Sequence, residues 1–276
     1  MQIITGTLRK MKGVANSPVE YVFRVGDHEL PFNETLDKTI YLRHTGEIYC
    51  IQCRRKTNKS FQQGYCFPCL KRLSECNLCI IHPERCNVEQ GTCPKDDWAH
   101  AHCYQSQIIY LANSSGLKVG ITRETQVPTR WIDQGAKQAI PIFKASNRYQ
   151  AGVIEVALKA FVSDRTNWRA MLKQDVEHMD LIGARDELLQ RAEGMLNAAM
   201  EEFNDDDITP ILDATVTELS YPILKYPQKV TSLSLDKTST IEGRLQGIKG
   251  QYLILDVGVL NVRKFGGYAI ECGVSS

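Results

Sequence analysis

Apolar residues follow strand-like patterns at both ends of the chain. The runs "YVFRVGDHEL" (21–30) and "QYLILDVGVLNV" (251–262) are rich in β-branched and aromatic residues, as is typical of strands. Each run follows a motif of the form G-x-L-x-x-x-K-G, which begins at Gly6 and again at Gly243. We therefore expect β structure at both termini, formed either by a duplicated unit or by two ends that pair in one small β domain.

A β-hairpin is predicted over residues 108–122. Two short apolar runs, "IIYLAN" and "LKVGIT", are joined by "SSG", a three-residue loop in which glycine takes the left-handed position. This loop places Tyr110 opposite Gly120 and Ala112 opposite Lys118, with all four residues on one face of the sheet. The glycine leaves room beside the phenol ring.

Short helical signals follow this hairpin. In "VPTRWIDQGA" (127–136), Pro128 suits a first helical turn and Gly135 suits a helix end, so Arg130 and Gln134 share one helix face. A second helix is expected over 148–162, with Glu155 among small and apolar neighbours. Its predicted apolar face consists of Val153, Val156, Ala157, Ala160 and Phe161.

The composition of the 276 residues, 43% hydrophobic and 24% charged, is that of a globular soluble protein. No apolar run approaches the roughly 18 residues of a membrane span, and the N-terminus lacks a signal-peptide core, so we expect a cytoplasmic protein without membrane contact. The net charge of +1 hides an uneven distribution. Residues 106–173 carry ten basic and four acidic side chains, whereas 174–218 carry two and thirteen, mostly on a predicted amphipathic helix. The small net charge therefore does not exclude a polyanionic partner such as nucleic acid.

Ten cysteines in an intracellular chain indicate metal ligands rather than disulfides. Cys50-x2-Cys53 and Cys66-x2-Cys69 have close to the spacing of a zinc ribbon, in which two knuckles complete a tetrahedron of thiolates. We predict one structural zinc ion at these four residues, because no ligand position is left for catalysis.

A second cysteine-rich stretch follows the first. We expect at least three of its five cysteines to converge on zinc or, alternatively, four of them on an iron–sulfur cluster, since thiolate ligation does not distinguish the two. These residues are Cys76, Cys79, Cys86, Cys93 and Cys103. Cys272 stands alone and is interpreted as a small buried hydrophobic residue.

The order of motifs in residues 106–168 resembles that of GIY-YIG nucleases. The matching elements are Tyr110 in "IIY", Lys118 in "KVGIT", Arg130 in "PTRW", Glu155 in "VIEVALK" and Asn167 in "RTNW". As a whole, the chain also resembles an uncharacterised bacterial family that joins cysteine-rich zinc motifs to such a module. The resemblance predicts an α+β fold: a small GIY-YIG-like sheet flanked by helices, with zinc-ribbon units and β structure at both termini.

The resemblance also implies roles for these residues. Tyr110 would be the base or orienter of an attacking water, and Lys118 or Arg130 would stabilise charge in the transition state. Glu155 would hold Mg²⁺ or Mn²⁺, and Asn167 would orient the site. The sequence departs from the family pattern in having Lys118 where tyrosine is usual and Gln134 where histidine is common; Arg130 also lies further along than usual.

Five segments are predicted. They are an N-terminal β unit (1–49), a cysteine-rich zinc-binding region (50–105), a GIY-YIG-like module (106–184), an amphipathic acidic helix (185–207) and a C-terminal β unit (208–276). The sequence favours a metal-dependent phosphodiesterase or endonuclease acting on DNA or RNA. The alternatives are a non-catalytic nucleic-acid-binding or regulatory protein and, third, an iron–sulfur redox or sensor protein. The sequence identifies no protein partner.

Overall fold

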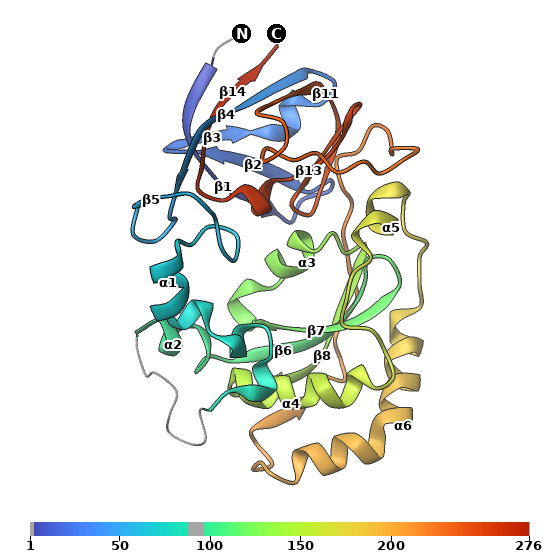
Figure 1. The fold of residues 1–276 in the computed structure, drawn as a ribbon. Helices are drawn as coiled ribbons and strands as arrows, with labels where there is room; N and C mark the ends of the chain where they lie inside the picture. Colours follow the sequence, from blue (N-terminus) through green and yellow to red (C-terminus); the bar gives the residue numbers. More distant parts are fainter. Residues whose placement is uncertain (1–2, 88–96, 276) are drawn as a thin grey trace.

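The computed structural model describes residues 3–87 and 97–275, which form two antiparallel sheets and several short helices (Figure 1). The predicted α+β class, with strands at both termini, is confirmed. The larger sheet contains β1 (Ile3–Val14), β2 (Glu20–Val25), β3 (His28–Pro31), β4 (Thr39–Tyr49), β5 (Lys56–Thr57), β11 (Thr240–Lys249), β12 (Tyr252–Leu255), β13 (Gly258–Asn261) and β14 (Tyr268–Val274).

The smaller sheet comes from the middle of the chain. It contains β6 (Gln107–Asn113), β7 (Leu117–Arg123), β8 (Gln138–Ala145), β9 (Ile208–Pro210) and β10 (Thr217–Glu218). The α-helices are α1 (Phe67–Arg72), α2 (Asp97–His102), α3 (Thr129–Asp133), α4 (Arg148–Lys159), α5 (Trp168–Lys173) and α6 (Leu181–Met200). The 3-10 turns are η1 (Phe32–Thr35), η2 (Ser74–Cys76), η3 (Leu78–Ile80), η4 (Pro83–Arg85), η5 (Glu124–Gln126) and η6 (Val262–Phe265).

The larger sheet is built from two equivalent units, β1–β4 and β11–β14, each with a 3-10 turn before its last strand. The strand order β13-β12-β11-β4-β14-β1-β2-β3 is unchanged when the two units are exchanged. The register agrees, because Gly6 pairs with Ile270 and, in the other unit, Gly243 pairs with Ile40. The chain ends therefore form a duplicated unit and also pair with each other.

Successive residues of β6 face opposite sides of the smaller sheet, as strand geometry requires. Ile108 and Tyr110 pack in the core that continues into the larger sheet. Ile109 and Leu111 belong instead to the core formed with α4 and α6. The smaller sheet thus lies between the larger sheet with α3 on one side and two helices on the other (Figure 1).

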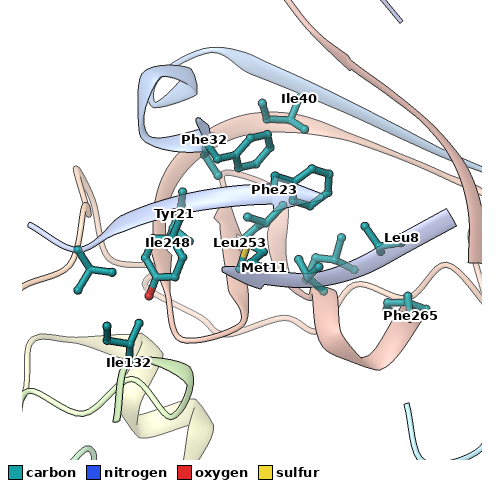
Figure 2. Packing of buried hydrophobic residues seen from close by; sticks show 14 of the residues in the cluster. Leu8, Met11, Tyr21, Phe23, Phe32, Ile40, Ile132, Ile248, Leu253 and Phe265 are labelled. Atoms are coloured by element: carbon teal, nitrogen blue, oxygen red, sulfur yellow. The ribbon is translucent and has the colours of Figure 1, made fainter. Parts of the chain in front are cut away.

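Helix α3 lies between the two sheets and is held by both β units. Ile132 is 1% exposed and points from α3 towards Tyr21 of the larger sheet (Figure 2). A Cβ atom placed on Gly13 would lie 2.5 Å from Ile132 Cγ2, and one placed on Gly250 would lie 3.0 Å from the Asp133 carbonyl oxygen. The last glycine of each sequence motif therefore allows the sheet to approach the helix.

Two of the predicted helices differ in detail from expectation. In α4, Ala157 is buried as predicted, but Val156 is 41% exposed and Ile154 and Leu158 are buried in its place, so the apolar face is rotated from the predicted one. Helix α6 begins at Leu181, where the Asp180 side chain accepts a hydrogen bond from the Gly183 N–H at 3.0 Å, and ends at Met200. The helices in the described part of the chain are all too short or too polar to span a lipid bilayer.

The close approach at Gly13 leads to a stability prediction. Gly13→Ala should lower the free energy of unfolding by about 1–3 kcal/mol, because buried Ile132 cannot move away from the added methyl group. Denaturant titration measures this change. Gly194→Ala is the matched control: it lies in α6 with no atom within 4 Å of its Cβ position and should raise stability by roughly 0.5–1 kcal/mol through helix propensity. Equal effects of the two substitutions would contradict the packing of α3 described above.

Candidate active site and metal centre

The first four cysteines converge as their spacing predicts. The sulfur atoms of Cys50, Cys53, Cys66 and Cys69 all lie within 4.8 Å of one another, and the Sγ atoms of Cys53 and Cys66 are 3.7 Å apart. Four thiolates bound tetrahedrally to zinc at about 2.3 Å would be separated by roughly 3.8 Å. The cluster therefore fits a zinc ion.

The backbone around this cluster is shaped for thiolates. Cys50 directly follows β4, and Cys66 precedes the first residue of α1. Burial raises the pKa of the Cys50 thiol, but backbone N–H groups of Cys53, Cys66 and Gln52 outweigh this effect and bring the pKa to about 6. Such N–H groups favour the charged form of the sulfur, which is the form that binds metal.

The second cysteine set is described only in part, because Cys93 lies outside the described residues. Cys76 lies near the first cluster, since the Cys50 charge contributes to raising its pKa to about 11, after burial and Glu75. Cys79 and Cys103 instead both act electrostatically on Arg148. The Cys103 carbonyl also accepts a hydrogen bond from the Arg148 N–H at 2.9 Å. Convergence of at least three of the five cysteines, a set that also includes Cys86, remains a prediction.

The β6–β7 hairpin has the predicted register. Tyr110 pairs with Gly120, and Ala112 pairs with Lys118. A Cβ atom on Gly120 would lie 2.7 Å from the Tyr110 hydroxyl oxygen, so only glycine leaves space for this ring. The buried Tyr110 hydroxyl donates a hydrogen bond to Gln134 Oε1 at 2.7 Å, which links the hairpin to the residue after α3.

A cleft of about 550 Å³ brings together four of the five residues predicted for catalysis. Tyr110 comes from β6, Lys118 from β7, Arg130 from α3 and Glu155 from α4. The sequence motifs therefore meet at one site although 45 residues separate Tyr110 from Glu155 along the chain. We call this hollow the catalytic cleft because residues that the sequence predicts for catalysis line it.

The catalytic cleft is also lined by charged residues that the sequence analysis did not identify as site candidates. Arg263 and Lys10 come from the two β units, far from the hairpin along the chain, and no sequence signal connects them to it. Arg148 is the first residue of α4, where the helix dipole disfavours a positive charge. This unusual position was a weak indication in the sequence that Arg148 has a function. The full set comprises Lys10, Arg123, Asp133, Arg148, Lys159, Asp164 and Arg263.

Positive charges in the catalytic cleft repel one another. The Arg130 charge contributes to lowering the pKa of Lys118, Arg148 and Arg263, in each case after the larger effect of burial. In the described part of the chain, neither Lys118, Arg130 nor Arg263 forms an ion pair with an acidic side chain. Cations held together without acidic partners are an arrangement that a bound anion stabilises.

Lys118 is buried and Glu155 is partly buried, and the loss of contact with water shifts the protonation equilibrium of each. Burial and then Arg130 lower the pKa of Lys118 to about 8, while Glu155 and Asp164 oppose this shift. Burial raises the pKa of Glu155, against the charges of Lys159 and Arg148. Burial likewise raises the pKa of Tyr110, so its side chain is a neutral phenol near pH 7.

Asn167 is not among the residues that line the catalytic cleft. It caps α5, where its side chain accepts a hydrogen bond from the Ala170 N–H at 3.2 Å. Its own N–H donates to the Ser115 hydroxyl in the hairpin loop at 2.9 Å. Asn167 therefore connects α5 to the hairpin, and a role in orienting the site remains a prediction.

Comparison with known proteins gives a family but no activity. A family model described as "Protein of unknown function (DUF2797)" matches residues 37–270. The chain belongs to this family. The matched span contains both cysteine sets and the hairpin, α3 and α4 of the catalytic cleft, whereas β1, with Lys10, precedes it. Neither the curated proteins nor the solved structures include a significant match to the chain.

The cysteine cluster leads to a prediction of metal content. Cys66→Ser should reduce bound zinc by one equivalent, because three thiolates and a hydroxyl hold zinc more weakly than four thiolates. Elemental analysis of the purified protein measures this. Cys272→Ala is the control, since Cys272 is buried in β14, outside the cluster, and its loss should leave the zinc content unchanged. Full zinc retention by Cys66→Ser would rule out this metal centre.

Proposed function

We propose that the protein is a metal-dependent phosphodiesterase that cuts nucleic acid in the catalytic cleft, with a structural zinc at Cys50, Cys53, Cys66 and Cys69. The observation that supports this most is the convergence of Tyr110, Lys118, Arg130 and Glu155 from four different elements on one cleft. Their residue types match what phosphodiester hydrolysis needs: a group to place water, cations for the developing charge and a carboxylate for a hard metal ion.

Tyr110 would orient the attacking water rather than remove its proton. Burial keeps its hydroxyl protonated near neutral pH, and that hydrogen is donated to Gln134 Oε1. The Tyr110 oxygen also accepts a hydrogen bond from the Arg130 side chain, which leaves one lone pair to accept a hydrogen bond from water. Gln134 would therefore fix the direction in which Tyr110 acts, a role that suits its position, where GIY-YIG nucleases commonly have histidine.

Lys118 and Arg130 would bind the phosphate and stabilise the charge that builds on it. Both line the cleft without an ion pair to an acidic side chain in the described residues, so the Lys118 ammonium group and the Arg130 N–H groups that do not bond to Tyr110 are available to an anion. Glu155 would hold Mg²⁺ or Mn²⁺, which would supply positive charge beside the leaving oxygen. A single carboxylate completed by water and phosphate is the usual form of such a site.

A second candidate function is nucleic-acid binding without cleavage. The observation that favours it is Lys118, which occupies the position where the nuclease family usually has tyrosine and thereby adds another cation to the cleft. Cleavage in the presence of a divalent ion separates the two functions, since both predict binding.

The role of the carboxylate gives the first functional test. Glu155→Gln should abolish Mg²⁺-dependent or Mn²⁺-dependent cleavage of single-stranded and duplex DNA and RNA, because the amide cannot hold the cation. Binding measured without divalent ions should persist, since the substitution removes a negative charge. Glu193→Gln on the exposed face of α6 is the control and should cut like the wild type. A wild-type protein that binds but never cuts would favour the second function.

The depressed pKa of Lys118 gives a pH test. Below pH 7 the ammonium group is charged, and it loses its proton as the pH rises through about 8, so affinity for nucleic acid should fall between pH 7 and 9. Lys118→Met should bind more weakly at pH 7 and lack this fall. The variant is needed because buried Lys249, outside the cleft, also has a pKa of about 8. A fall in affinity of equal size in the wild type and in Lys118→Met would show that a group other than Lys118 causes it.

A further inference from the structure

A second hollow of about 990 Å³, which we call the side cavity, adjoins the catalytic cleft. It is bounded by β1 of the larger sheet, by the cysteine-rich segment and by α2. Its volume is at the upper end of the range for ligand sites. The two hollows are continuous, so a long ligand could occupy both at once. Six residues line both of them: Lys10, Ile80, Ile81, Trp98, His102 and Arg263.

The boundary between the two hollows carries flat and apolar side chains. The rings of Trp98 and His102 are stacked, with centroids 4.1 Å apart and planes inclined by 6°. The His102 Nδ1–H donates to the Trp98 carbonyl at 2.8 Å, which fixes this stack. Ile81, which is 65% exposed, lies at the same boundary. Partly exposed rings beside an exposed apolar side chain suit the faces of nucleobases.

Cations line the remainder of the side cavity. Arg9 comes from β1 and Arg54 from the loop between the two cysteine knuckles, and neither forms an ion pair in the described part of the chain. Glu75 is the acidic residue among the described lining residues. The side cavity shares Trp98 and His102 with the catalytic cleft and adds Arg9 and Arg54 to them. This combination matches a ligand with both rings and phosphates.

We propose that the side cavity binds a single strand of nucleic acid whose scissile phosphate lies in the catalytic cleft, with at least one base against Trp98. This inference rests on the proposed function and specifies its substrate as single-stranded. Base faces are exposed to a protein only where they are unstacked, and a duplex hides them. Stacking on Trp98 therefore favours unstacked bases over duplex, whereas contacts from the cationic side chains alone would not distinguish the two.

The experiment compares short and long strands on the full-length protein. Affinities for oligothymidylates of about three and about eight nucleotides are measured by calorimetry without divalent ions. Trp98→Ala should weaken binding of the longer strand about 5-fold to 100-fold, the range for loss of one base stack, and should weaken binding of the shorter strand by a clearly smaller factor, since Trp98 lies at the edge of the catalytic cleft. Arg9→Ala should reduce the salt dependence for the longer strand only. Arg191→Ala on exposed α6 is the control and should change neither.

Trp98→Phe separates stacking from folding, because phenylalanine keeps an aromatic face and should retain most of the affinity. The proposal is overturned if Trp98→Ala binds the longer strand like the wild type, if it weakens both strands equally, or if duplex competes as well as single strand. Failure of the proposed function is distinct: a wild type that binds with this dependence on Trp98 but cuts nothing supports the side cavity and excludes the nuclease.

Discussion

The attachment of α3 to the larger sheet is the constraint on which the catalytic cleft depends. Helix α3 has five residues, too few to be stable on its own backbone hydrogen bonds. Its last residue, Asp133, pairs with Lys10 from the first β unit and accepts a hydrogen bond from Gln251 Nε2 at 2.9 Å from the second. Since Arg130 lies one turn before Asp133, the two β units together determine where its guanidinium group points.

Local features of the sequence predicted part of this site well. The hairpin register followed from a three-residue loop, because the loop fixes which residues face each other. The cysteine cluster followed from two C-x2-C knuckles, because each knuckle brings its own sulfurs together regardless of the rest of the chain. Tyr110, Gly120 and Cys50 could therefore be placed before any tertiary contact was known.

The remainder depended on contacts between distant segments. Arg263 enters the cleft from a 3-10 turn in the second β unit, which only the pairing of that unit with the first brings near the hairpin. The apolar face of α4 was misplaced because the sequence offers apolar residues around much of the helix. The choice between Val156 and Ile154 is made by η4 and α6, which pack against α4 and are not visible in its own periodicity.

The pairing of β1 with β14 has a consequence for biosynthesis. During translation, the hairpin, α3 and α4 leave the ribosome well before β11–β14, which complete the larger sheet. Until then α3 lacks Gln251, and the cleft lacks Arg263. Assembly of the cleft is therefore one of the last events in the maturation of the chain, and a nascent or prematurely terminated polypeptide would carry the motifs without the finished site.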